Sequence, residues 1–328
     1  MVSSNHIFCV SPRRPRVIFV MRWIVLLCVL CACVAAQEPP NIRVDVNLVN
    51  IAFTVRDAQG ALAAGLSRDD FEILEDGVPQ RPSFFARSQD VPLTLGLIAD
   101  ASGSQEHFLH QHHHHLEEFL HEVLRPGDRA FLVCFGNHLR LVSDYTASPA
   151  QLIDSLNQFE HGHAHFPDLG PVEDRELGTA FYDALYYAVT EKVATAESGR
   201  RALIVFSDGE DNSSAHHMMD AIETAQIADT RVYALRYTQR EHGRLTARNK
   251  YGIRVMERIA HETGGQDYDA MQHDVRNVFR QIGEELRSSY ELAYVSSNPV
   301  RDGSFRKVVI RAKVPGLTVR AKTGYYAR

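Results

Sequence analysis

The centre of the chain alternates between short apolar runs and longer stretches whose apolar residues recur at helical spacing. The apolar runs predict strands at residues 93–99, 129–135, 140–145, 201–206, 231–237 and 266–268. The longer stretches predict helices at residues 106–124, 151–159, 178–193, 215–228, 250–262 and 275–288. Because strands and helices that alternate in this way build doubly wound sheets, we expect an α/β fold with a mostly parallel sheet.

The two flanking segments have a different pattern, with short strands and tight turns. Residues 44–55 alternate apolar and polar positions, and residues 290–295, 306–311 and 317–320 return to the same style. We therefore expect the two flanking segments to form one small β-sandwich module. The predicted domains are an N-terminal β segment at 37–91, the α/β domain at 92–289 and a C-terminal β segment at 290–328.

Residues 1–36 have the composition of a secretory signal peptide. Basic residues from Arg13 to Arg22 precede an apolar run that ends in small residues at Ala36. Cleavage after Ala36 predicts a protein that is secreted, periplasmic or held in the cell envelope. Leu30-Cys31-Ala32-Cys33 also resembles a lipobox, and a lipid on Cys33 would tether the protein to a membrane. Met21 is an equally good candidate for the start of translation as Met1.

Loss of the leader makes the chain more acidic. The leader carries four arginines and no lysine or acid, so the formal net charge changes from −6 for the whole chain to −10 for the mature one. An acidic surface repels nucleic acid, and this excludes that class of partner. Only Cys134 remains outside the leader, inside an apolar strand, so we expect neither a disulfide scaffold nor a thiol nucleophile.

Oxygen-bearing side chains follow two of the predicted strands. The run Asp100-Ala-Ser-Gly-Ser follows one strand, Asp208 follows another, and Thr179 lies at the start of a helix. Ligands of open α/β sheets bind beyond the carboxyl ends of the strands. Two carboxylates and three hydroxyls suit Mg²⁺, Mn²⁺ or Ca²⁺ better than zinc or copper. The predicted metal ligands are Asp100, Ser102, Ser104, Thr179 and Asp208.

These three elements resemble the metal-ion-dependent adhesion site of von Willebrand factor A and integrin inserted domains, in which Asp-x-Ser-x-Ser is followed by a Thr and an Asp. The resemblance implies a Rossmann-like fold in which Ser102 and Ser104 coordinate the metal directly. It implies that Thr179 coordinates directly or through water and that Asp100 and Asp208 often act through water. A Glu or Asp carboxylate of a partner protein would complete the coordination, as in cell adhesion.

The resemblance extends beyond the metal motif. The run Asp-Phe-Glu-Ile-Leu-Glu-Asp-Gly at residues 70–77 and the closing Lys-Thr-Gly-Tyr-Tyr are similar to those of von Willebrand-related proteins of Acidobacteria. Gln105 stands where many relatives place Met. Because Gln105 lies outside the ligand set, we expect it to leave metal binding undisturbed.

Simpler interpretations compete with this one. Asp100 and Asp208 could only cap helices, and Ser-Gly-Ser could be no more than a tight turn. A structural or assembly protein, whose metal only stabilises it, is the alternative function. A metal-dependent hydrolase is less favoured, because Ser102 lacks the Gly-x-Ser-x-Gly setting and the chain has no phosphate-binding Gly-Lys-Ser/Thr loop. We therefore expect a binding protein and not an enzyme.

Histidines are numerous, with 17 in the chain. On the helix at 106–124, His107, His110, His114 and His121 fall opposite the apolar face, whereas His112 and His113 fall towards it without an evident reason. His107, His110 and His114 have spacings that suit a secondary transition-metal site, and the alternative is a solvated helix face. The histidine-rich loop at 161–170 is either a ligand-recognition loop near the metal or a variable surface loop.

Overall fold

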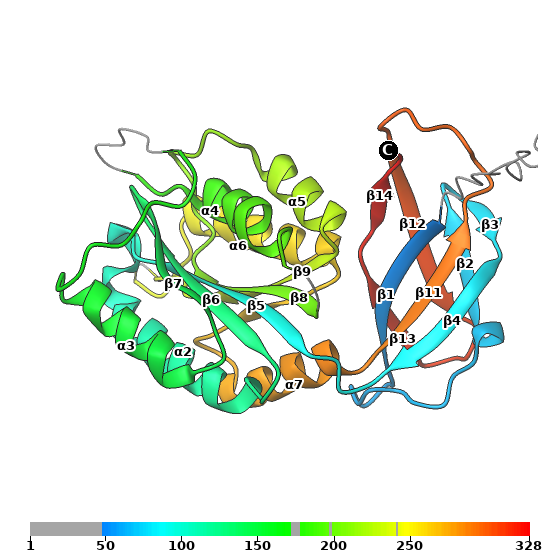
Figure 1. The fold of residues 1–328 in the computed structure, drawn as a ribbon, viewed down its shortest axis with the longest axis horizontal. Coiled ribbons are helices and arrows are strands. Elements are labelled where there is room, and N and C mark those ends of the chain that lie inside the picture. Colours follow the sequence, from blue (N-terminus) through cyan, green and yellow to red (C-terminus); the bar gives the residue numbers. More distant parts are fainter. Residues whose placement is uncertain (1–47, 172–177, 197–198, 241) are drawn as a thin grey trace, which may run out of the picture. The chain divides into compact units, whose positions relative to one another are not determined.

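A six-stranded sheet forms the centre of the α/β part of the protein (Figure 1). The computed structural model describes residues 48–171, 178–196, 199–240 and 242–328. In the order of the sheet, the strands are β10 (Asp267–Asp269), β9 (Thr230–Arg236), β8 (Arg200–Ser207), β5 (Leu93–Asp100), β6 (Arg129–Phe135) and β7 (Leu139–Thr146). All neighbours pair in parallel except β6 and β7. The predicted α/β fold with a mostly parallel sheet is confirmed.

Helices pack on both faces of this sheet. One face carries α2 (Leu109–Val123), α3 (Pro149–Glu160) and α7 (Val275–Arg287). The other carries α4 (Phe181–Tyr187), the π-helical turn η3 (Ala188–Val193), α5 (Met218–Ile227) and α6 (Ala247–Thr263). Every residue of β5 is buried, with Leu95 and Leu97 facing the first layer and Ile98 the second. This two-sided burial explains why β5 is apolar at successive positions.

An ion pair fixes the end of α7. The guanidinium of Arg287 lies 2.5 Å from Asp128 Oδ2 and donates to the carbonyl of Val123 at 2.7 Å. Asp128 also accepts from the backbone amides of Leu93 and Arg125. Both charged side chains are more than nine-tenths buried, so the pair joins α7 to the starts of β5 and β6.

The flanking segments form two four-stranded antiparallel sheets. The first has the order β13 (Thr318–Ala321), β1 (Leu48–Arg56), β11 (Ser289–Val295) and β4 (Pro82–Ser88). The second has the order β14 (Gly324–Tyr326), β12 (Phe305–Ala312), β2 (Phe71–Glu75) and β3 (Val78–Gln80), and the 3-10 turn η1 (Arg68–Asp70) precedes β2. Phe53 and Tyr290 of one sheet contact Phe71 of the other, in a shared apolar core. The predicted β sandwich made from both flanking segments is confirmed.

Two predicted helices differ in detail from the observed ones. The helix expected at 106–124 begins earlier, as the 3-10 turn η2 (Gly103–Phe108), before α2 starts at Leu109. The helix expected at 178–193 starts at Phe181, because Gly178 has a φ of 144°, outside the helical region. The domain boundaries stay predictions. The proposed leader, with Cys33 and Met21, lies outside the described residues, and within the described ones no helix is long and apolar enough to cross a membrane.

Candidate metal centre

Four of the predicted ligands meet at the carboxyl edge of the parallel sheet. Asp100 is the last residue of β5, and Asp208 directly follows β8. The two strands are neighbours, with Ala99 opposite Phe206 at their ends. Ser102 and Ser104 follow β5 on η2, and their hydroxyl oxygens lie 3.2 Å apart.

Each carboxylate divides its two oxygens between a local and a distant partner. Asp100 Oδ1 accepts from the amide of Ser102 at 2.9 Å, while Oδ2 accepts from Ser207 Oγ at 2.5 Å. Asp208 Oδ1 accepts from the amide of Glu210 at 3.0 Å, while Oδ2 accepts from Ser104 Oγ at 3.0 Å. The local bond of each aspartate goes to the amide two residues further on, as in a turn, and neither aspartate is the N-cap of a helix. The other oxygen joins segments that are about a hundred residues apart in the sequence.

Thr179 reaches the same edge through its backbone and its neighbours. Its amide donates to Asn212 Oδ1 at 2.7 Å, and its carbonyl accepts from the amide of Asn212 at 3.1 Å. Ala180 donates to the carbonyl of Gly136, the residue after β6, at 3.0 Å. A Cβ built on Gly136 would lie 3.5 Å from the backbone of Ser102, so Gly136 separates Ser102 from the segment of Thr179. Thr179 is itself 4% exposed.

The turn after Asp208 is packed tightly against α6. Gly209 has a φ of 77°, which favours glycine, and a Cβ there would lie 2.5 Å from the carbonyl oxygen of Gly252. Further along, Asp183 Oδ1 accepts from the amide and from Nδ1 of His216, at 2.9 and 2.8 Å. The loop from Asp208 to His216 thus packs against α6 at Gly209 and is bonded to the start of α4 at His216.

The electrostatics of this edge favour a cation. Asp100 is fully buried and Asp208 is 4% exposed. Burial and the negative charge of Asp208 raise the pKa of Asp100 to about 7. Burial and Asp208 also raise the pKa of Glu210, which pairs with Arg248 at 2.5 Å. Within the described ranges, no Lys, Arg or His forms an ion pair with Asp100 or Asp208, so their charges lack an internal counter-ion.

Of the comparisons with known proteins, only the one with solved structures finds matches. No family model matches the sequence, and no curated protein matches it. The chain is similar to von Willebrand factor type A. A structure of that name from Catenulispora acidiphila shares 13% identity, with 87% of this chain and 74% of that chain covered and a TM-score of 0.42.

Two further solved structures show a likeness of the same degree. The manganese-loaded TRAP protein of Plasmodium vivax shares 13% identity, with 73% of this chain and 96% of that chain covered and a TM-score of 0.42. Proximal thread matrix protein 1 from the mussel byssus, with a zinc-occupied MIDAS motif, shares 14% identity, with 65% of this chain and 50% of that chain covered and a TM-score of 0.43. Such likeness concerns the fold alone, and the acidobacterial type of the chain stays a prediction.

Gln105 contacts one of the predicted metal ligands directly. Its Nε2 donates to Asp208 Oδ2 at 2.7 Å and to the carbonyl of Tyr237 at 3.3 Å, and the residue is 1% exposed. Gln105 lies outside the predicted ligand set, and the expectation that it leaves metal binding undisturbed stays a prediction. It holds one of the two carboxylates in place.

His112 lies behind Asp100, in the core of the first helical layer. It is 3% exposed, and its ring meets the ring of Tyr237 edge-on at a centroid distance of 4.2 Å. Burial lowers the pKa of His112 to about 3, an effect that the backbone of Asp100 opposes. His113 lies at the edge of the same face and pairs with Glu160 at 3.0 Å. These contacts explain why both histidines fall towards the apolar face of α2.

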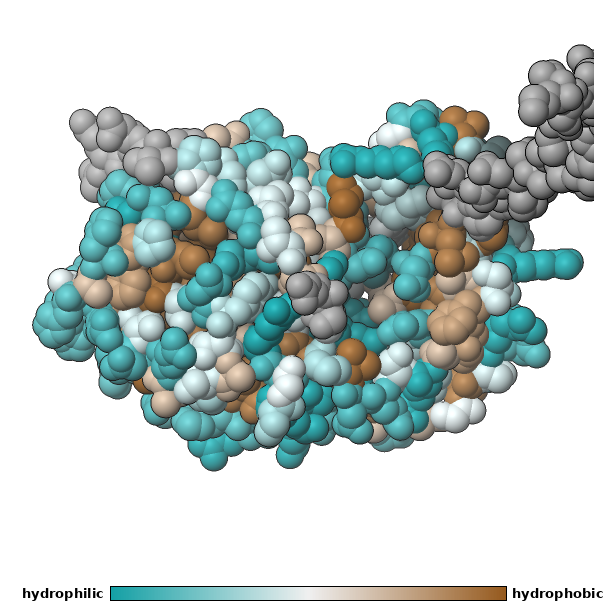
Figure 2. Space-filling view, in the orientation of Figure 1, coloured by the Kyte–Doolittle hydropathy of each residue, from teal (hydrophilic) through white to brown (hydrophobic). Residues whose placement is uncertain are grey.

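Four other histidines of this region lie on the surface. His107, His110, His114 and His121 are all exposed, and Figure 2 shows a mainly hydrophilic surface over α2 and α3. His114 lies 3.7 Å from Glu118. In the part of the chain that the structure describes, no three His, Cys, Asp or Glu side chains form a group that could hold a metal ion. These four histidines thus lie on a solvated helix face, and their positions give no support to a secondary metal site at His107, His110 and His114.

The histidine-rich loop is anchored at one end. Leu169 is buried, and Asp168 pairs with Arg140 of β7 at 2.5 Å. His161, His163 and His165 are exposed, and the rings of the first two stack at 5.4 Å. Its two interpretations, a recognition loop or a variable loop, both stay predictions.

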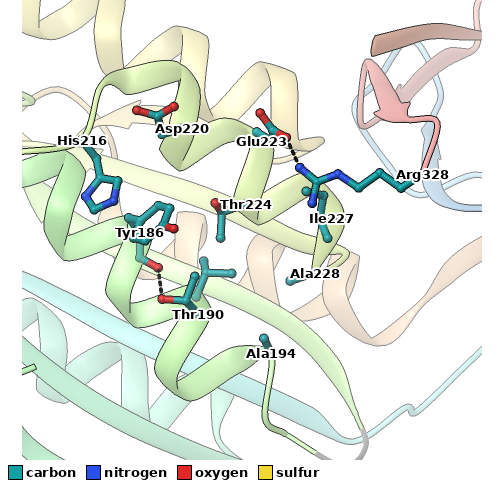
Figure 3. A pocket seen from close by; sticks show the side chains of 11 residues that line it. Tyr186, Thr190, Ala194, His216, Asp220, Glu223, Thr224, Ile227, Ala228 and Arg328 are labelled. Atoms are coloured by element: carbon teal, nitrogen blue, oxygen red, sulfur yellow. Dashed lines mark hydrogen bonds and ion pairs between the residues drawn. The ribbon is translucent and has the colours of Figure 1, made fainter. Parts of the chain in front are cut away.

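A separate pocket of ≈ 540 Å³ lies between α4–η3 and α5 (Figure 3). Its lining includes Tyr186 and His216, whose rings stack at 3.6 Å, and Glu223, which pairs with Arg328 at 2.5 Å. None of the five predicted metal ligands lines it.

Cys134 is buried as predicted, and burial raises the pKa of its thiol.

Proposed function

We propose that this protein is a metal-dependent protein-binding module. Its partner would be a protein that offers a Glu or Asp carboxylate to a divalent cation, Mg²⁺ or else Mn²⁺ or Ca²⁺, at the carboxyl edge of the sheet. The observation that carries the proposal is the buried pair Asp100 and Asp208, which has hydroxyl and amide partners but no counter-ion among the described residues. A buried charge is stable only when it is compensated.

The donor atoms fit such a cation. Carboxylate and hydroxyl oxygens are the ligands that Mg²⁺ and Ca²⁺ prefer. Ser104 Oγ lies within hydrogen-bonding distance of both Ser102 Oγ and Asp208 Oδ2. Asp100 would balance the positive charge of the cation, and Thr179, just before α4, would supply a further hydroxyl ligand. When bound, the metal supplies a positive centre with a free coordination position for an external carboxylate.

A calorimetric titration tests the metal site. Mg²⁺ or Mn²⁺ added to the chelator-treated protein is expected to bind with one-to-one stoichiometry. Asp208→Asn, which preserves shape but removes a charge, is expected to lose this binding. The matched control is Asp154→Asn, at an exposed aspartate in the middle of α3. Undiminished binding by Asp208→Asn would contradict the assignment.

Capture of partners separates binding from a purely structural role. Immobilised wild-type protein and Asp208→Asn are exposed to cell-envelope extract, with and without chelator. Capture that requires both Asp208 and the metal supports the proposed function. Capture that persists with Asp208→Asn and also in the presence of chelator would favour the alternative, in which the metal only stabilises the fold.

We also propose that the mature protein is exported. The support is the arginine-rich and apolar sequence of residues 1–36. Mass spectrometry of the mature N-terminus is expected to find a chain that begins at Gln37. A lipid-modified N-terminal Cys33 would instead establish a membrane tether, and an uncleaved leader would contradict both forms of the proposal.

A further inference from the structure

A basic pocket lies at the opposite, amino-terminal edge of the parallel sheet. Arg200 and Arg201 open β8, and Arg231 is the second residue of β9. The pocket has a volume of ≈ 250 Å³. Its other lining residues are Asn50, Ala52, Gly199, Asp229 and Glu291. Since β8 ends next to Asp208, this pocket and the candidate metal centre lie at the two ends of the same strand.

Arg231 is the most unusual member of this group. It is 5% exposed, and both of its terminal nitrogens, Nη1 and Nη2, are buried without a hydrogen-bond partner. A guanidinium carries a permanent charge and five donors, and to bury it without acceptors costs several kcal/mol. It also lines a second, smaller cavity of ≈ 30 Å³, together with Lys322. A side chain in this position requires an acceptor that the described residues do not supply.

The two neighbouring arginines are only partly satisfied. Arg200 Nη2 lies 2.5 Å from Glu291 Oε1, but Arg200 Nη1 is buried without a partner. Arg201 donates to the neutral carbonyls of Ala228 and Ala196, and its Nε is buried without a partner. Burial and the positive charge of Arg231 lower the pKa of Arg200 to about 10.

The charges around the pocket do not balance. Glu291 is paired with Arg200, and Asp229 is paired with Lys322. Among the described residues, no ion pair includes Arg201 or Arg231, so no described carboxylate is paired with these two positive charges. Positive charges held together in a buried site repel each other, and an anion between them would remove the repulsion.

We propose that this pocket is a binding site for a small tetrahedral oxyanion of the phosphate or sulfate class. The planar fork of a guanidinium matches the oxygens of such an anion, and three arginines at one site present several forks together. The ligand is either the free ion or the phosphate or sulfate group of a larger ester. The site is independent of the metal centre, because no residue of one belongs to the other.

Thermal unfolding of the full-length protein tests the site. Measurements in chloride, sulfate and inorganic phosphate are made at equal ionic strength with chelator present. Both oxyanions are expected to raise Tm over chloride in a saturable way, since a ligand that binds only the folded state stabilises it. Phenyl phosphate serves as the ester probe. Equal stabilisation by the ester indicates a site open to larger molecules, and stabilisation by the inorganic ions alone indicates a site for the free ion.

Arg231→Met makes the test specific. The variant is expected to lose the oxyanion-dependent rise in Tm, with phosphate affinity at least tenfold lower by ³¹P NMR titration. In chloride its Tm is expected to equal or exceed that of the wild type, because an unpartnered buried charge has been removed. An arginine with a merely structural role would give a lower Tm. The control is Arg254→Met, an exposed arginine of α6.

Several results would overturn the proposal. One is an equal Tm of the wild type in chloride, sulfate and phosphate. Another is unchanged phosphate affinity in Arg231→Met. Arg231→Lys, which keeps the charge but not the fork, provides a second variant in case Arg231→Met fails to fold, and its phosphate affinity should fall several-fold. Magnesium binding should be unchanged in every one of these variants, so failure of this site is distinguishable from failure of the metal centre.

Discussion

Gln105 Nε2 donates a hydrogen bond of 2.7 Å to Asp208 Oδ2, the same oxygen that accepts from Ser104 at 3.0 Å. The amide is anchored in turn, at 3.3 Å, on the carbonyl of Tyr237 just after β9. Three segments of the chain thus determine the direction of one carboxylate. Side chains that orient metal ligands in this way commonly affect metal affinity as strongly as some ligands do.

We expect Gln105→Met to weaken Mg²⁺ or Mn²⁺ binding by on the order of tenfold, because Asp208 loses a donor that fixes its direction. Methionine has a similar length and no polar atom to bury. In the metal-free state, the free energy of unfolding of the variant should therefore lie within about 1 kcal/mol of the wild-type value. Calorimetric titration and urea unfolding give the two quantities. Equal metal affinity in the variant and the wild type would show that Gln105 only fills space.

Chelation provides a second prediction. Addition of EDTA should lower the Tm of wild-type protein prepared in magnesium and leave that of Asp208→Asn unchanged. In the metal-free state Asp208→Asn should be at least as stable as the wild type, since it removes a charge that raises the pKa of Asp100. Differential scanning calorimetry with and without EDTA measures both effects. A chelator-induced fall in the variant equal to that in the wild type would refute the assignment.

Because His112 is buried, we expect the folded protein to lose stability in acid. The pKa of its imidazole is about 3 in the folded state, against an ordinary value of 6.5, because burial disfavours the charged form. A depressed pKa means that the unfolded chain takes up the proton first. Stability is therefore present above pH 6.5 and falls towards pH 3, at a rate that approaches about 1.4 kcal/mol per pH unit.

His112→Leu should remove this dependence. Denaturant unfolding of the variant and the wild type between pH 7 and pH 4 measures the difference. Relative to the wild type, the variant should gain stability as the pH falls. The exposed histidine His121 supplies the matched control, and His121→Leu should leave the slope unaltered. Parallel pH profiles for wild type and His112→Leu would contradict the buried, neutral state of this ring.

The pair Arg287 and Asp128 should be sensitive to the loss of one member. Arg287→Ala leaves the carboxylate of Asp128 buried without its cation, and the expected cost is about 3–5 kcal/mol in the free energy of unfolding. Arg276→Ala, on the same helix but exposed, breaks a surface pair with Glu118 and should lower the free energy of unfolding far less than Arg287→Ala does. Urea unfolding compares them. Similar costs for the two variants would mean that the buried pair contributes no more than the surface pair.

The parts of the fold that follow a regular period were predictable from the sequence. β5 and β6 are apolar along most of their length because helices cover both faces, and the end of β5 places Asp100 at the sheet edge. The burial of Gln105 could not be predicted from a helix drawn from Glu106 onward. The chain forms a 3-10 turn there, whose period of three residues puts Ser102, Gln105 and Phe108 on one side.

Other features depend on neighbours that the sequence does not name. The helical period indicated that His112 faces the core, but its contact with Tyr237 joins residues on α2 and beyond β9. Arg231 begins what was predicted as an ordinary apolar strand. Its significance comes from Arg200, Arg201 and the strand edges around them, which are brought together only in the folded protein.

β8 begins with Arg200 and Arg201 and ends at Ser207, directly before Asp208. At about 3.3 Å per residue, roughly 25 Å of strand separate an electropositive end from an electronegative one. An acidic partner would therefore be repelled from the carboxyl edge of the sheet as long as no cation neutralises the negative charge of that edge. If the proposed function is correct, assembly must follow a compulsory order in which the cation binds first and the partner second, and the rate of association should rise with occupancy of the cation.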